Sequence, residues 1–359
     1  MNVFIRTDAS TEIGTGHVMR CLVLAKQLQK RNVTVYFICR KLAGNLISYI
    51  EEQGFPVISL QAVKSENDYN WFENHWKRDS DETIALMKPY QQIDWLIIDH
   101  YGIDIRWEKE MKPHVQRMMV IDDLANRPHI CDLLLDQNVL PQMEKRYNHL
   151  IPKRTKQLLG IRYILLREEF TRYKNFNRDV THVKNILISF GGADETNETL
   201  KALQALTSFN TELFTIHVVI GSTSPHAETI KTYRENYTTV KIYENINNIS
   251  YLMKIADIAI GAGGSTTWER CYMLLPTITI ETAPNQSEIL AYLSKLGAVY
   301  HLGKSSNVSE RMIGIAVQTL MEEHQVRLNM ITVLESLLEG FQDNLVVDEL
   351  ISFQKGEGI

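Results

Sequence analysis

Short runs of β-branched and other apolar residues alternate with helical patterns along almost the whole chain, and this alternation constrains the fold most strongly. Strands that alternate with helices predict parallel sheets with crossover helices. Some of the runs are apolar at successive positions, as expected for strands that helices cover on both faces. We therefore predict an α/β fold. The runs are VFIR, VTVYFIC, PVISL, WLIID, MMVID, DLLLD, NILISF, FTIHVVI, VKIYE, DIAIG and TITIE.

The length of the chain indicates two domains. Its 359 residues exceed the roughly 250–300 residues over which a single hydrophobic core usually extends. A segment from about residue 141 to residue 182, rich in Lys and Arg and without clear periodicity, separates the two sets of strands. We predict two doubly wound, Rossmann-like domains, residues 1–165 and 166–359, that face each other across a cleft. Docking of the terminal helix on the first domain is an alternative to its inclusion in the second.

Polar residues follow the ends of several predicted strands. Ligands of open α/β sheets bind in the crevice outside the carboxyl ends of the strands, so we expect the binding site among these loops. The residues are Asp99, His100, Tyr101, Asp122, Asp123, Asp136 and Asn138 in the first half, and the stretches GGADETN and GAGGSTTWE in the second.

Composition narrows the class of partner. With 44% hydrophobic and 23% charged residues, the chain is typical of folded proteins. A net charge of −5 disfavours nucleic acid, which prefers a basic face. The first apolar run is too short for a signal peptide, and no stretch reaches the roughly 18 apolar residues of a membrane span, so we expect a cytoplasmic protein. The expected partner is a small molecule, and the oligomeric state is left open, with a monomer as one alternative.

No residue pattern indicates a metal or another cofactor, and we predict neither. Asp79-Ser80-Asp81 has a D-x-D shape but is better explained by helix capping, and Asp122-Asp123 is a poor metal pair. The four cysteines lie far apart and include no C-x-x-C pair, so we predict buried, reduced thiols.

The stretch GAGGSTTWERCYMLLP predicts a helix that begins near Ser265 or Thr266, is capped by one of them, and stops before Pro276. Glycines before a helix start leave amides free to approach an anion, and the helix dipole favours negative charge. We interpret Gly263, Gly264, Ser265 and Thr266 as a diphosphate loop. The alternative is a tight strand-to-helix turn without a ligand.

Glu269 and the pair Gly191-Gly192 have two interpretations each. A carboxylate in the first helical turn complements the dipole, which is a sufficient structural reason for Glu269. Its functional alternative is bidentate hydrogen bonding to a ribose diol. The two glycines after NILISF allow close approach of the backbone to a ligand, although a GG pair after a strand is commonly a turn.

His17 stands in the stretch IGTGHVMRCL, behind two glycines and at the amino end of an apolar helical stripe. A positive helix end keeps an imidazole neutral, and a general base must be neutral. We therefore interpret His17 as a base, with a loop hydrogen bond as the structural alternative. Tyr101 and Asn285 are further polar candidates for the cleft, and each is also compatible with a plain turn.

Taken together, these motifs resemble the UDP-sugar hydrolases of pseudaminic acid biosynthesis and their relatives in spore-coat polysaccharide synthesis. The resemblance runs from about residue 1 to residue 300 and implies a GT-B-like fold. It is carried by IRTDASTEIGTGHVMRCLVLA, LIIDHYG, VIDDLANRPHICDLLLDQN, LLGIRYILLREEF, ISFGGADETN and GAGGSTTWERCYMLLPTITIETAPNQ.

The resemblance implies a metal-free hydrolysis of UDP-2,4-diacetamido-2,4,6-trideoxy-β-L-altropyranose to UDP and the free sugar. It assigns catalysis to His17, Tyr101 and Asn285, the diphosphate to the loop 263–266, and the ribose to Glu269. Substrate contacts are also expected from residues of the same motifs. These are Asp8, Gly14, Gly16, Arg20, Gly191, Gly192 and Gln286.

Two departures bear on the sugar. Thr7-Asp8 replaces the commoner Ala-Asp, and the charged, tryptophan-containing stretch 64–86 has no clear counterpart and is a candidate lining of the sugar site. The expected mechanism is an inverting attack of water on the anomeric carbon, with His17 as the base that activates the water. A glycosyltransferase with a UDP-sugar donor and a non-catalytic UDP-sugar binding protein are the alternatives.

Overall fold

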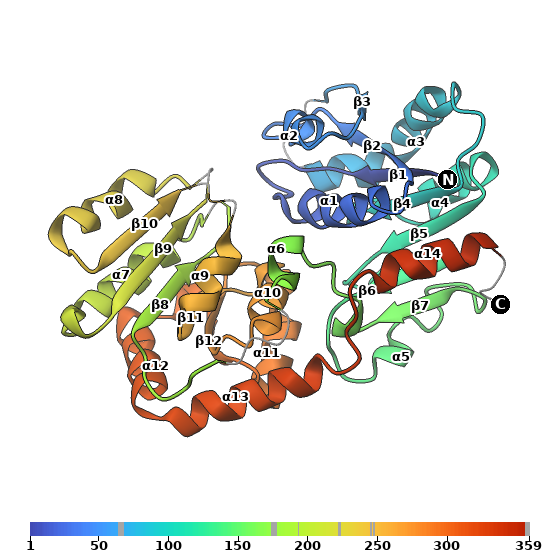
Figure 1. Ribbon diagram of the computed structural model, residues 1–359. Coiled ribbons are helices and arrows are strands. Elements are labelled where there is room, and N and C mark those ends of the chain that lie inside the picture. The colour runs from blue at the N-terminus through green and yellow to red at the C-terminus, as the bar shows by residue number, and fades with distance from the viewer. Residues whose placement is uncertain are drawn as a thin grey trace. The chain divides into compact units, whose positions relative to one another are not determined.

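The computed structural model describes residues 1–63, 68–173, 178–192, 194–221, 224–244, 246 and 248–355. The chain divides into two compact units (Figure 1). The first comprises Met1–Asn138, Gln142–Leu165 and Phe341–Ile359, and the second comprises Val139–Pro141 and Leu166–Gly340. The terminal segment therefore belongs to the first unit, the option that the sequence left open for the last helix.

The first unit is a doubly wound parallel sheet with strand order β3-β2-β1-β4-β5-β6-β7. Every pair of neighbouring strands is parallel. Its strands are β1 (Asn2–Thr7), β2 (Thr34–Arg40), β3 (Val57–Leu60), β4 (Trp95–Asp99), β5 (Arg117–Ile121), β6 (Leu133–Asp136) and β7 (Lys156–Leu159). Its helices are α1 (Gly16–Gln29), α2 (Ile47–Glu52), α3 (Asp68–Met87), α4 (Ile105–Met111), α5 (Met143–Arg146) and α14 (Leu345–Lys355).

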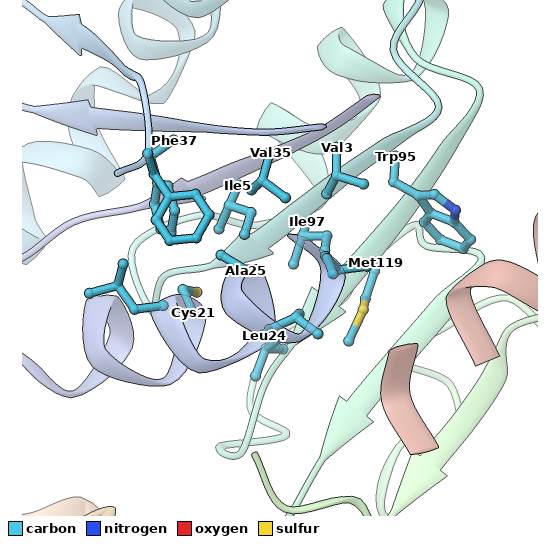
Figure 2. Packing of buried hydrophobic residues seen from close by; sticks show 14 of the residues in the cluster. Val3, Ile5, Cys21, Leu24, Ala25, Val35, Phe37, Trp95, Ile97 and Met119 are labelled. Carbon is cyan, nitrogen blue, oxygen red and sulfur yellow. The ribbon is translucent and has the colours of Figure 1, made fainter. Parts of the chain in front are cut away.

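Alternate residues of each central strand enter two different cores, one on each face of this sheet. Val3 and Ile5 of β1 pack with the apolar stripe of α1, whereas Phe4 packs on the opposite face with Trp107 of α4. Figure 2 shows Leu24 and Ala25 of α1 against the first face. Burial on both faces explains the continuous apolar runs of the sequence and confirms the prediction of helix-covered parallel strands.

The second unit repeats this architecture with strand order β10-β9-β8-β11-β12-β13, again with all neighbours parallel. Its strands are β8 (Asn185–Ser189), β9 (Thr215–Ile220), β10 (Val240–Glu244), β11 (Ile258–Ala262), β12 (Thr277–Glu281) and β13 (Tyr300–Lys304). Its helices are α6 (Glu168–Thr171), α7 (Glu198–Thr207), α8 (Ala227–Asn236), α9 (Ile249–Ile255), α10 (Thr266–Tyr272), α11 (Ser287–Leu296), α12 (Glu310–Glu322) and α13 (His324–Leu337).

The stretch 64–86, for which the sequence suggested a role at the sugar site, forms most of α3, while residues 64–67 lie outside the described part of the chain. Asp79 lies in the middle of this helix, so its interpretation as a helix cap is wrong. Its carboxylate is fully buried and accepts hydrogen bonds from Arg6, Arg40 and the indole of Trp107 at 2.6–3.0 Å. Asp79 therefore ties α3 to β1, β2 and α4.

Replacement of this buried carboxylate is expected to destabilise the first unit strongly. Asp79→Asn breaks the buried ion pairs with Arg6 and Arg40, and breaking such pairs costs about 3–5 kcal/mol. Among the described residues, Arg6 then keeps only Asp8 and Arg40 only Glu82 as an ion-pair partner. Chemical denaturation measures the loss. Asp81→Asn is the matched control, because the Asp81 side chain is 58% exposed on the same helix, and its effect should stay within about 0.5 kcal/mol. Equal stabilities of the two variants would contradict the role of Asp79.

Candidate active site

The loops singled out in the sequence follow the strands at which each sheet reverses its order. In the first unit the reversal lies between β1 and β4, which precede the His17 loop and Tyr101. In the second it lies between β8 and β11, which precede Gly191-Gly192 and the loop 263–266. Such switch points open a crevice at the carboxyl ends of the strands, where doubly wound sheets bind their ligands. Each unit thus presents one candidate binding edge.

His17 is paired with a carboxylate. It lies in the first turn of α1, is only 6% exposed, and its Nδ1 is 2.6 Å from Oδ1 of Asp99 at the end of β4. An ionised carboxylate only accepts, so Nδ1 carries the proton in this hydrogen bond. In the neutral ring the lone pair is then on Nε2. This arrangement is the one that a histidine general base requires.

Arg20, one turn after His17 on α1, holds the same carboxylate. Its Nε and Nη2 donate to Oδ2 and Oδ1 of Asp99, both at 2.6 Å. Burial alone would raise the pKa of Asp99, but the charge of Arg20 and the hydrogen bonds from Arg20 and His17 lower it well below its usual range. Asp99 is therefore ionised at neutral pH and fixes the orientation of both side chains.

Arg20 also connects this pair to Tyr101. Its Nη1 donates to Oδ2 of Asp123 at 2.8 Å, and the hydroxyl of Tyr101 donates to Oδ1 of the same carboxylate at 2.6 Å. The rings of His17 and Tyr101 meet edge to face with centroids 4.4 Å apart. The structure thus brings together three residues expected at the site, His17, Arg20 and Tyr101.

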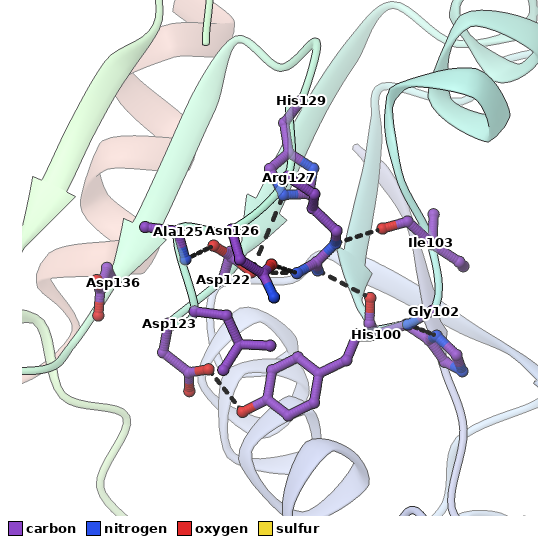
Figure 3. A network of polar contacts seen from close by, with 12 residues as sticks. His100, Gly102, Ile103, Asp122, Asp123, Ala125, Asn126, Arg127, His129 and Asp136 are labelled. Atoms are coloured by element: carbon purple, nitrogen blue, oxygen red, sulfur yellow. Dashed lines mark hydrogen bonds and ion pairs between the residues drawn. The ribbon is translucent and has the colours of Figure 1, made fainter. Parts of the chain in front are cut away.

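The loops after β4 and β5 are held together by Arg127 (Figure 3). Its guanidinium pairs with Asp122 at 2.8 Å and donates to the carbonyl oxygens of His100 and Ile103. A Cβ at Gly102 would lie 2.7 Å from Cβ of Phe72, so this loop requires glycine there. These contacts leave little freedom to the loops that carry Tyr101 and Asp123.

The substrate contacts expected of the first loop differ in their surroundings: Asp8 is buried, whereas Gly14 and Gly16 have open space beside them. Asp8 is fully buried, and its carboxylate accepts from the Arg40 amide at 2.6 Å and pairs with Arg6 at 2.8 Å. It supports the strand ends and offers no surface to a ligand in this structure. Gly14 has a φ of 77°, which favours glycine, and a Cβ at either glycine would have no neighbour within 4 Å.

In the loop 263–266, the first residue is held by contacts within the unit, whereas the amides of the other three are not bonded to the backbone of the described residues. The Gly263 amide donates to Oε1 of Gln286, and a Cβ there would lie 2.6 Å from Leu290, so Gly263 and Gln286 shape the loop. Ser265 stands at the N-cap of α10 but makes no capping hydrogen bond with its side chain, which corrects that expectation. The amides of residues 264–266 have no backbone acceptor within the described part of the chain.

The remaining candidate residues, like the loop 263–266, belong to the second unit. Glu269 is in the first turn of α10, where its carboxylate binds both nitrogens of the Arg167 fork at 2.8 and 3.0 Å. Gly191 has a φ of 88° and, like Gly192, is exposed. Asn285 is exposed in a short 3-10 turn after β12.

Sequence reasoning placed Asp99 and Asp123 near the site but assigned no role to either. Their importance follows from contacts across 82 and 103 residues of sequence, to His17 and Arg20. The available signal was their position directly after two predicted strands. The described residues include no group of three or more His, Cys, Asp or Glu side chains that could hold a metal ion.

Comparison with known proteins assigns the chain to a family. Residues 185–332 match the glycosyltransferase family 28 C-terminal domain. The chain is 30% identical to the UDP-2,4-diacetamido-2,4,6-trideoxy-beta-L-altropyranose hydrolase of Campylobacter jejuni, over 83% of this chain and 97% of that protein. The chain belongs to the family of this hydrolase. The resemblance inferred from the motifs is thereby confirmed.

Two further relatives extend the family. The spore coat polysaccharide biosynthesis protein SpsG of Bacillus subtilis is 24% identical over 92% of both chains. An uncharacterized protein of Methanocaldococcus jannaschii is 30% identical over 84% of this chain, which spans only 60% of the length of that relative.

Solved structures confirm the GT-B-like fold of this family member. MurG of Acinetobacter baumannii covers 99% of both chains with a TM-score of 0.66 and 15% identity. The spinosyn rhamnosyltransferase SpnG covers 98% of this chain and 100% of its own, with a TM-score of 0.69 and 13% identity. No helix among the described residues has the length and apolar character needed to cross a membrane.

Proposed function

We propose that the chain hydrolyses a UDP-activated diacetamido-trideoxy sugar to UDP and the free sugar, 2,4-diacetamido-2,4,6-trideoxy-L-altrose, without a metal. The observation that carries this proposal is the buried His17–Asp99 pair at the switch point of the first sheet. Membership of the hydrolase family supports the same substrate class. The product would serve the synthesis of pseudaminic acid or of a spore-coat polysaccharide, the two pathways that the motifs indicated.

In this mechanism Nε2 of His17 takes a proton from water while the oxygen attacks the anomeric carbon. The carbon–oxygen bond to UDP breaks, and the bonding electrons leave with the diphosphate. Asp99 stabilises the imidazolium that forms, and Arg20 keeps Asp99 ionised and in place. Tyr101, tied to Asp123, would position the sugar or the water next to His17.

The nucleotide would be bound by residues of the second unit. The open amides of residues 264–266 would receive the diphosphate, and the charge that develops on it during bond cleavage would be stabilised there. Glu269 would accept hydrogen bonds from the ribose diol. Gly191, Gly192 and Asn285 are exposed near the ends of β8 and β12 and would complete the substrate contacts.

The test is UDP release from UDP-2,4-diacetamido-2,4,6-trideoxy-β-L-altropyranose in the presence of a chelator and without an acceptor. UDP-N-acetylglucosamine is the comparison. We expect rapid release from the first substrate and little from the second. UDP binding without release from either, followed by release when an acceptor sugar is added, would replace the hydrolase with a glycosyltransferase. UDP binding without turnover under any condition would leave a binding protein.

A further inference from the structure

Glu269 already has a bidentate partner in this structure. Nε of Arg167 donates to Oε1 at 2.8 Å, and Nη2 donates to Oε2 at 3.0 Å. The two side chains belong to the same unit and are 29% and 13% exposed, so the pair is partly shielded from water. Forked arginine–carboxylate pairs of this kind are among the stronger and more directional ion pairs in proteins.

A ribose diol needs the same edge of the carboxylate. Its two hydroxyls donate one hydrogen bond to each oxygen, as the two nitrogens of the arginine fork do. One edge cannot hold both partners at once. We propose that Arg167 is a latch on Glu269, which the ribose diol of the nucleotide must displace, and that this competition sets the affinity for UDP. The inference rests on the proposed function, because it takes UDP as the ligand.

The displaced guanidinium has a second partner in place. Nη1 of Arg167 is 2.7 Å from Oε1 of Glu169, and Oε2 of Glu169 is anchored by the Ser250 amide at 3.1 Å. In the same short helix, α6, the side chain of Phe170 is fully buried and fixes the position of the backbone. The Arg167 side chain can therefore leave Glu269 and remain paired with Glu169 while the backbone of α6 stays in place.

The position of Arg167 in the chain gives the latch a consequence. The polypeptide passes from the first unit to the second between Leu165 and Leu166, directly before Arg167. Opening of the latch by the ribose would remove the Arg167–Glu269 contact between this segment and α10, while the contacts of Glu169 and Phe170 remain. Nucleotide binding would thus change one side-chain contact next to the segment that joins the two units.

The latch is tested by calorimetric titration with UDP and with 2′,3′-dideoxy-UDP, which lacks the diol. Arg167→Met is expected to bind UDP about fivefold more tightly than the wild type, the gain from losing a forked but partly exposed competing ion pair. Its affinity for the dideoxy nucleotide should be unchanged. Arg172→Met, which removes an exposed arginine nearby, should change neither affinity. Glu269→Ala, which removes both acceptor oxygens, should remove the preference for UDP over the dideoxy nucleotide.

Each other outcome is decisive. Weaker or equal UDP binding by Arg167→Met would overturn the latch. An equal gain in affinity for UDP and for the dideoxy nucleotide would also overturn it, because the gain would then come from the change in charge and not from the diol. Should Arg167→Met fail to fold, Arg167→Lys keeps the charge but not the fork and should give a smaller gain confined to UDP. Absence of UDP binding by the wild type would overturn the proposed function, whereas tight binding without discrimination overturns only the latch.

Discussion

His17→Asn is expected to lower the turnover of the diacetamido sugar nucleotide by about 10²–10⁴-fold, the contribution typical of a positioned general base. Asparagine retains a polar side chain but cannot take a proton from water at neutral pH. The dissociation constant for UDP should stay within about twofold, because the proposed diphosphate and ribose contacts come from the second unit. Release of UDP under saturating substrate and calorimetric titration with UDP measure the two effects.

The matched control is His114→Asn, which changes an exposed histidine in the same unit and should retain full turnover. Thermal unfolding establishes whether both variants are folded. A folded His17→Asn protein with wild-type turnover would eliminate His17 as the base. Loss of UDP binding together with turnover would instead indicate that His17 contacts the nucleotide.

The central part of the fold could be predicted from the sequence because its strands are buried on both faces. WLIID and NILISF became β4 and β8, whereas the strands β7 and β13 were not predicted. Both lie at the edge of a sheet and are only partly buried, so their sequences KQLL and YHLGK lack a continuous apolar run. Edge strands carry a weaker sequence signal for this reason.

The position of the last helix could not be derived from local pattern. Val346, Val347 and Leu350 of α14 enter the core of the first unit, and Asp348 pairs with Arg31. An amphipathic stripe predicts that a helix buries one face but does not say against which sheet. That choice depends on contacts across about three hundred residues of sequence.

The same limit applies to the site. The GTGH loop made His17 a candidate base, but its partner is set by the pairing of β1 with β4, whose register brings Thr7 opposite Asp99. For Asp79 the local pattern was misleading. It suggested a helix cap, whereas the side chain pairs with two buried arginines. Local spacing thus indicated which residues are unusual, whereas the topology of the sheet decided their partners.

Asp99→Asn is expected to lower turnover by about 10²–10⁴-fold, the same range as His17→Asn, because Asp99 acts through His17. We expect the new amide oxygen at the position of Oδ2, where it accepts from Nε of Arg20, so that the amide nitrogen takes the position of Oδ1 and faces Nδ1 of His17. That nitrogen donates, so Nδ1 must accept and the ring proton moves to Nε2. The lone pair required of the base is then directed at residue 99 instead of water.

Nitrogen NMR of the His17 ring separates this effect from simple destabilisation. The wild type should show the proton on Nδ1, and Asp99→Asn should show it on Nε2. Asp123→Asn is the control, since it removes the other carboxylate of Arg20 but leaves the His17–Asp99 hydrogen bond intact. It should share the loss of stability and keep the Nδ1 tautomer. A folded Asp99→Asn protein with an unchanged tautomer and wild-type turnover would show that Asp99 does not position the base.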